Sequence, residues 1–155
     1  MTEKNKTNPR RAAFDSLRKI EESGRYSNLE IDSTLEKSEM NQADRGLYTR
    51  LVYGVTERRL TLDYIISQYS RMSAYKLDHD VLTALRLGVY QMMFMDRIPD
   101  HSAVNESVEL VSRTKSGYVN AVLRSFIRGG KKYKLPENEE ERLEVQYSVP
   151  REICR

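Results

Sequence analysis

Cysteine and histidine are nearly absent from this chain of 155 residues, which contains one cysteine and two histidines. Cys154 has no partner for an internal disulfide, and this fits a reducing compartment, so a cytoplasmic location is expected. Apart from Cys154, the usual nitrogen and sulfur metal ligands are limited to His79 and His101. No metal site is predicted.

Long apolar runs and glycine-rich loops are also missing. The most apolar stretch, GVYQMMFM at residues 88–95, is far shorter than the ~20 residues of a membrane span. The opening MTEKNKTNPRR lacks the apolar segment of a secretory signal. No phosphate-binding loop of the dinucleotide or nucleotide type is present, and no serine, histidine and acid arrangement stands out. We therefore predict no membrane contact and no catalytic residue in this chain.

Helical periodicity, in contrast, runs along nearly the whole sequence. Apolar residues recur at spacings of three and four, and no segment alternates as a half-buried strand does. Asn8 and Pro9 are expected to begin the first helix and Gly24 to end it. Further helices are expected near residues 27–38, 41–59, 61–69, 78–95, 100–113 and 119–128. The sequence predicts an all-α bundle of about seven helices, with residues 78–95 at its centre.

The same pattern suggests how the chain is organised. Residues 1–7 are predicted to be a flexible N-terminus and residues 8–128 the helical domain. The periodicity stops at Gly129 and Gly130, so residues 129–138 are predicted to be a linker. Residues 139–155 begin a new segment, which we expect to lead into a further domain.

The charge of the chain is unevenly distributed, although the net charge is only +3. Residues 113–134 contain seven basic residues and no acidic one, whereas residues 135–144 contain five glutamates and one arginine. Segregation of this kind creates a local positive field on a nearly neutral protein. Lysines also commonly do no more than solvate a helix face, and this alternative stays open.

Spacing within the basic segment favours a nucleic acid over a membrane. Asn120, Arg124 and Arg128 recur at i, i+4 and i+8, so they form one ridge beside the apolar stripe of the last predicted helix. The stripe matches a buried core face and leaves no wide apolar face for lipid. A cationic ridge suits phosphates, which release counterions when they are neutralised. The candidates from this segment are Lys115, Arg124, Arg128, Lys131 and Lys132.

Two asparagines interrupt otherwise apolar helices. Asn105 lies between Val104 and Val108, and Asn120 follows Val119. A buried amide without a hydrogen-bond partner costs about 1–3 kcal/mol. We expect both asparagines to tie neighbouring helices or loops together, with ligand contact as the alternative.

Several motifs together resemble one family. LRLGVYQMMFMDRIPDHSAVNESVELVSR and the following GYVNAVLRSFIR are similar to a helical domain with two branches. These branches are the transcription antitermination factor NusB and the N-terminal part of the bacterial ribosomal RNA methyltransferase RsmB (Sun). DRGLYTRLVYGVTERRLTLDYII and NPRRAAFDSLRKI resemble the same family. The resemblance implies a NusB-like helical bundle that binds RNA.

Three features favour the methyltransferase branch. VNAVLR carries Arg124 where the antitermination factor usually has an acidic residue, and DRIPDHSAVNESVEL resembles the methyltransferase wording. VQYSVPREICR resembles the sequence motif that, in the methyltransferase, leads from the helical domain towards the catalytic portion. The resemblance then implies an enzyme that methylates the 5-position of a cytosine in small-subunit ribosomal RNA. Its S-adenosylmethionine and cysteine nucleophile belong to a later, C-terminal methyltransferase domain, and Cys154 matches no catalytic motif.

The resemblance adds two residues to the candidate site. In the antitermination relatives the basic first helix contacts RNA, which corresponds here to Arg10 and Arg11, although Asp15, Glu21 and Glu22 share that helix. Two alternatives remain. The chain could be a free-standing antitermination factor that binds RNA with a ribosomal protein, or a structural module whose basic ridge docks on its own catalytic domain.

Overall fold

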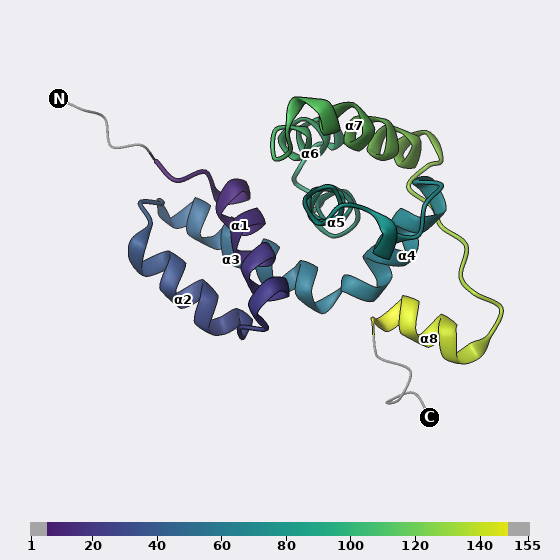
Figure 1. Cartoon of the computed structure of the whole chain (residues 1–155), viewed down its shortest axis with the longest axis horizontal. Helices are drawn as coiled ribbons and strands as arrows, with labels where there is room; N and C mark the ends of the chain where they lie inside the picture. Colours follow the sequence, from purple (N-terminus) through teal and green to yellow (C-terminus); the bar gives the residue numbers. More distant parts are fainter. Residues whose placement is uncertain (1–5, 149–155) are drawn as a thin grey trace. The chain divides into compact units, whose positions relative to one another are not determined.

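The computed structural model describes residues 6–148, in which eight α-helices and one short 3-10 helix are found and no strand (Figure 1). The predicted all-α class is confirmed, and the seven predicted helices are all present. The eighth lies at Glu139–Tyr147. The helices fall into two compact units, Met1–Thr56 and Glu57–Arg155.

The first unit contains α1 (Pro9–Ser23), α2 (Ser27–Lys37) and α3 (Gln42–Glu57), whose last residue begins the second unit. The predicted ends of α1 are confirmed. The Asn8 side chain accepts hydrogen bonds from the backbone N–H groups of Arg10 and Arg11, at 2.9 and 3.2 Å. Gly24 ends the helix with a φ of 68°, a left-handed conformation that glycine adopts without steric cost.

A buried polar network accompanies the apolar contacts of the first unit. Ser16 donates to the carboxylate of Glu30 at 2.8 Å, and the hydroxyl of Thr34 donates to the same oxygen at 3.0 Å. Because the single hydroxyl proton of Ser16 goes to Glu30, the Tyr48 hydroxyl, 2.7 Å from Ser16, is the donor in that pair. The network satisfies a carboxylate that is only 4% exposed, and it joins three helices.

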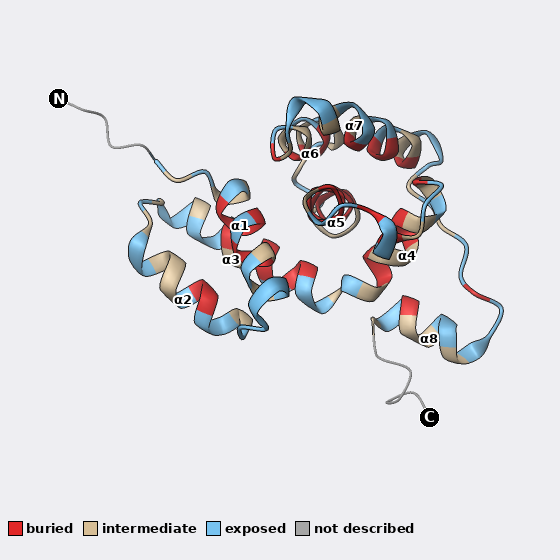
Figure 2. Ribbon diagram, in the orientation of Figure 1, coloured by how far each residue is buried: buried red, intermediate tan, exposed pale blue. Residues whose placement is uncertain are grey.

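The second unit is built around α5 (His79–Phe94). Its other elements are α4 (Arg59–Tyr69), the 3-10 helix η1 (Ala74–Lys76), α6 (Asp100–Val108), α7 (Arg113–Arg128) and α8 (Glu139–Tyr147). Helix α5 contacts α4, α6 and α7, and twelve consecutive residues, Val81–Met92, are buried (Figure 2). The prediction that this helix is central and surrounded is confirmed.

One charged residue lies inside this apolar helix. Arg86 is 8% exposed, and its guanidinium donates to both carboxylate oxygens of Asp63 on α4, at 2.7 and 2.9 Å. A two-point bond of this kind satisfies a charge that is taken out of water and fixes the register of α4 against α5.

Three predicted helix boundaries were wrong. The helix expected near residues 61–69 begins at Arg59 as α4, and the Thr61 hydroxyl donates to the backbone carbonyl of Val145. The helix expected over residues 100–113 ends at Val108, and the helix expected over residues 119–128 already begins at Arg113 as α7. A tight turn separates the two, with the N–H of Leu110 bonded to the carbonyl of Ser107. Apolar spacing continues through this turn, which is why periodicity alone did not locate it.

Gly88 allows α5, α6 and α7 to approach closely. A Cβ at this position would lie 2.8 and 2.9 Å from the two δ-methyl carbons of Leu123 on α7, and 2.9 Å from the Ser107 hydroxyl on α6. Both neighbours are fully buried. The missing side chain therefore sets the depth at which α7 sits on α5.

Gly88→Ala is expected to destabilise the protein by about 1–3 kcal/mol, because an extra methyl in a packed core forces its neighbours off their preferred positions. Gly117→Ala is the matched control, since nothing lies within 4 Å of its Cβ. As a change from glycine to alanine inside α7, it should stabilise by up to about 1 kcal/mol. Urea unfolding followed by circular dichroism measures both. Equal effects of the same sign would show that the space at Gly88 is not limiting.

Candidate nucleic-acid interface

Helix α7 separates an apolar face from a basic one. Val119, Val122, Leu123 and Phe126 are buried, as their spacing predicted. Arg124 lies between these positions and Arg128 follows them, and both are exposed. Packing of the apolar stripe therefore turns both guanidinium groups towards solvent, one turn apart.

The side chains of the two arginines are held by neutral partners. Arg124 donates to the Asn120 carbonyl oxygen at 3.1 Å, and Arg128 donates to the Ser125 hydroxyl at 3.0 Å. Lys132, four residues beyond the end of α7, is exposed. Within residues 6–148, none of these three cations has a carboxylate partner, so their charge is available to an external anion.

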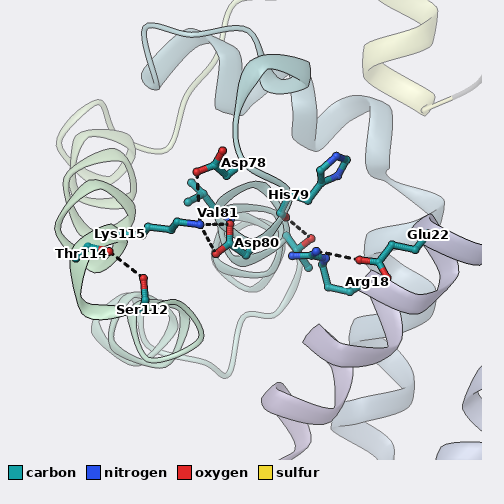
Figure 3. A network of polar contacts seen from close by, with 10 residues as sticks. Arg18, Glu22, Asp78, His79, Asp80, Val81, Ser112, Thr114 and Lys115 are labelled. Carbon is teal, nitrogen blue, oxygen red and sulfur yellow. Dashed lines mark hydrogen bonds and ion pairs between the residues drawn. The ribbon is translucent and has the colours of Figure 1, made fainter.

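Lys115 is different, because two carboxylates at the start of α5 surround its ammonium group (Figure 3). Its Nζ lies 2.8 Å from one oxygen of Asp80, 3.1 Å from the other and 3.5 Å from Asp78. The hydrogen bond to Asp80 raises the pKa of Lys115. Burial opposes ionisation of Asp80, but the bonds from Lys115 and the Val81 N–H outweigh it and lower the pKa of that carboxyl.

Lys131 is also engaged within the protein. Its Nζ lies 3.3 Å from a carboxylate oxygen of Asp100, the first residue of α6. Its backbone, with a φ of 57°, follows Gly130 at 75° in a left-handed turn that ends α7. Its N–H donates to the Phe126 carbonyl at 2.9 Å. Lys131 therefore helps to terminate a helix and is already paired.

Arg10 and Arg11 lie in the first turn of α1, in the first unit. Arg11 is exposed, and its guanidinium stacks over the Phe14 ring at 5.3 Å. Burial raises the pKa of Asp15, one turn further on, although Arg11 and Lys19 act to lower it. This carboxyl offsets part of the positive field of the helix start.

The expectation for the two asparagines was wrong. Asn105 is exposed on α6, and no hydrogen bond of its side chain is found among the described residues. Asn120 is half-buried and bonds Arg124 one turn along the same helix. Neither side chain therefore joins two elements. In both cases the apolar neighbours in sequence occupy the buried face, and the asparagine falls beside it.

Sequence reasoning missed the acidic partners of the lysines. These partners are Asp78, Asp80 and Asp100, which in the sequence are only acidic residues near predicted helix starts. Each lies 31 or more residues from the lysine that it contacts in the fold. It also left out Arg113 and Lys134, which are exposed and lie at the two ends of the same basic segment.

Two further features, a metal-binding cluster and a membrane-spanning helix, are not found in the part of the chain that the structure describes. In residues 6–148 no group of three histidine, cysteine, aspartate or glutamate side chains is arranged to hold a metal ion. No helix among these residues is both long and apolar enough to cross a bilayer. Cys154 lies outside the described residues.

A family model described as the NusB family matches residues 7–128. A protein of Bacillus subtilis named "Probable ribosomal RNA small subunit methyltransferase B" is 36% identical over 129 residues, which cover 81% of this chain and 29% of that protein. A Synechocystis protein of the same name is 35% identical and is covered to 33%. The chain thus spans about a third of the length of these relatives. The Transcription antitermination protein NusB of Bacillus licheniformis is 31% identical over 76% of this chain and 92% of its own length.

Solved structures show the same fold at lower identity. One is titled as antitermination factors NusB and NusE in complex with dsRNA. It matches 79% of this chain and 95% of its own chain, with a TM-score of 0.70 and 23% identity. The structure of T. maritima NusB matches 88% of this chain and 97% of its own chain, with a TM-score of 0.68 and 23% identity. The predicted NusB-like fold and the resemblance read from the motifs are confirmed.

Asp80→Asn is expected to destabilise the protein by an amount that stays constant from about pH 7 to about pH 4 and shrinks below that. Because folding lowers the pKa of Asp80, its carboxylate stabilises the folded state above the unfolded-state pKa. That contribution is lost as the pH falls through the folded-state value. Urea unfolding across this pH range measures it.

Lys115→Gln and the double variant complete a thermodynamic cycle that isolates the pair. Asp32→Asn is the control, since Asp32 is exposed and has no ion pair within residues 6–148. A difference between the parent and Asp80→Asn that grows on acidification would contradict this assignment.

Proposed function

Because this chain belongs to the NusB family, we propose that it binds and positions RNA as the N-terminal domain of an S-adenosylmethionine-dependent methyltransferase. The substrate of that enzyme would be a cytosine of small-subunit ribosomal RNA. Support comes from the two methyltransferase relatives, which align over 81 and 91% of this chain. The partners would be ribosomal RNA and the enzyme's own C-terminal methyltransferase domain.

The observation that carries the RNA role is the set of exposed cations without carboxylate partners at residues 124, 128 and 132. Each can neutralise a phosphate without first breaking an ion pair. Arginine can donate two parallel hydrogen bonds to phosphate oxygens, which favours the ridge of α7 as a backbone contact. Stacking of Tyr118 on RNA bases would contribute less than these phosphate contacts. The Tyr118 hydroxyl donates to the Ser70 carbonyl at 2.7 Å, and this bond fixes the ring at one edge.

The seven candidate cations are expected to contribute unequally. Lys115 and Lys131 must leave aspartates before they meet a phosphate, so each would gain less from RNA than an unpaired cation. Arg10 and Arg11 lie at the start of α1, where the dipole of the helix adds to their positive charge. They would act as a second contact region in the first unit.

The chemistry of methyl transfer would belong to the later domain of the parent enzyme. There S-adenosylmethionine would supply the methyl group and a cysteine would attack the cytosine ring. The contribution of this chain would be orientation of the RNA, which converts a bimolecular search into a held geometry. An enzyme that acts on ribosomal RNA works in the cytoplasm, so the same location is expected here.

Replacing Arg124, Arg128 and Lys132 by alanine is expected to weaken binding of a labelled small-subunit ribosomal RNA fragment by about tenfold or more at low salt. Three lost contacts should also reduce the slope of log K against log salt concentration by about 2 for a single strand. Fluorescence anisotropy at several salt concentrations measures both quantities.

The matched control is Lys115→Ala/Lys131→Ala, which removes two cations that are already paired and should cost less. Arg10→Ala/Arg11→Ala tests the first unit separately. If the triple variant binds the fragment as tightly as the parent, with the same salt slope, the RNA role of α7 is wrong. Circular dichroism must show that each variant keeps its helix content.

The methyltransferase and antitermination branches differ in the part of the gene downstream of the helical domain. We expect the reading frame to continue beyond Arg155 into a methyltransferase domain. Sequencing the genomic locus checks this. A stop codon directly after Arg155 would favour the free-standing antitermination factor.

A further inference from the structure

The segment that follows α7 lies along α4 instead of extending freely. We call residues 129–148 the C-terminal strap; they lie beyond residue 128, where the family match ends. Figure 1 shows the strap in yellow-green, leaving α7 and reaching α8, which contacts α4. Residues 129–138 were predicted to be a linker, and their backbone contacts give them a more definite role.

The first half of the strap is held by two side chains near the end of α4. The Tyr69 hydroxyl donates to the backbone carbonyl of Lys132. Gln68 bonds both backbone groups of Lys134, because its amide donates to the Lys134 carbonyl at 2.9 Å and its carbonyl oxygen accepts from the Lys134 N–H at 3.2 Å. The glutamine thus pairs with the strap much as a neighbouring strand would, independently of the lysine side chain.

The second half is held at the start of the same helix. The Thr61 hydroxyl donates to the Val145 carbonyl, and the N–H of Leu60 donates to the Ser148 hydroxyl at 3.0 Å. Val145 is 5% exposed, and it is the one buried residue of α8. Asn138 caps α8 by accepting from the Glu141 N–H at 3.0 Å.

The two anchoring regions are two helical turns apart on α4. Thr61 and Gln68 are seven residues apart, which places them on one face of the helix about 10 Å from each other. A flexible chain of twenty residues has a root-mean-square end-to-end distance of about 25 Å, so its free end samples a wide range of positions. Anchors at both ends of one face remove this freedom.

We propose that the C-terminal strap is a docked coupling, which fixes where and in which direction the polypeptide leaves the helical unit. Thr61, Gln68 and Tyr69 are its positioning residues. The existence of a following methyltransferase domain and the RNA-binding role of the helical unit both rest on the proposed function, whereas the docking of the strap on α4 does not. Such a coupling would hold an RNA-binding surface and a following domain in one arrangement, so that RNA bound to the first is presented to the second without a search.

The test measures a distance distribution across the second unit by electron paramagnetic resonance. Spin labels are placed on the whole chain at Ala121→Cys of α7 and Gln146→Cys of α8, both exposed, in a Cys154→Ser background. The parent should give one narrow distribution. The triple variant Thr61→Val/Gln68→Ala/Tyr69→Phe should give a distribution at least about twice as wide, since free strap residues sample a chain-like range.

The matched control makes the same three chemical changes on exposed positions of α3: Thr56→Val/Gln42→Ala/Tyr53→Phe. It should keep the parent's narrow distribution. A broad distribution in the parent, or a triple variant as narrow as the parent, overturns the proposal.

A milder variant keeps the test decisive if the triple variant fails to fold. Gln68→Ala removes the acceptor of the Lys134 N–H, so hydrogen exchange at that amide should become about tenfold faster or more while the amides of α5 are unchanged. Unchanged exchange at Lys134 would overturn the proposal.

RNA affinity is measured in the same preparations. A parent that has a narrow distribution but does not bind the ribosomal RNA fragment contradicts the proposed function alone. A broad distribution with intact RNA binding contradicts the strap alone.

Discussion

The packing of Leu123 against Gly88 is the contact on which the second unit depends. It sets how deeply α7 sits on the buried α5, and the depth decides which residues of α7 reach solvent. Val119, Val122 and Phe126 of α7 are buried as well, and Phe126 packs edge-on against Tyr69 of α4. The side chains of Arg124 and Arg128 are therefore left to point towards solvent. The basic ridge is therefore a consequence of core packing, and its geometry is as rigid as the core beneath it.

Ion pairs with carboxylates determine which of the cations around this ridge remain available to bind an external anion. Asp80 and Asp100 each stand within the first two residues of a helix, where the dipole favours negative charge. Each is thereby stabilised twice, by the helix and by the lysine that it contacts. The pairs with Lys115 and Lys131 anchor α7 and the turn that follows it. The remaining exposed cations carry the field that an approaching polyanion meets.

Local signals made most of the fold predictable. Capping at Asn8 and Gly24, and the long apolar run at residues 78–95, depend on neighbours in sequence, and they gave the right helices and the right centre. The Thr61 hydroxyl bonds the carbonyl of Val145, which is distant in sequence, so spacing could not show this contact. The end of α6 is a local turn, but the apolar spacing continues through it and hides it. The candidate site was predictable to the same degree. Exposure of Arg124 and Arg128 followed from periodicity, whereas the pairing of Lys115 and the isolation of Asn105 required the tertiary structure.

The strap shows how a polar segment with weak periodicity can still take a defined place. It buries little apolar surface beyond Val145 and Pro136, so the hydrophobic effect alone would hold it loosely. Its order depends on α4 offering side-chain donors and acceptors at the spacing of its backbone groups. Gln68 satisfies two of these groups at once, and their alternative partner is water, so each bond contributes a modest net amount, about 1 kcal/mol. Several such bonds at two anchoring regions act together, because forming one brings the others within reach. A coupling of this strength holds an orientation under native conditions and still gives way to local opening before the core of α5 does.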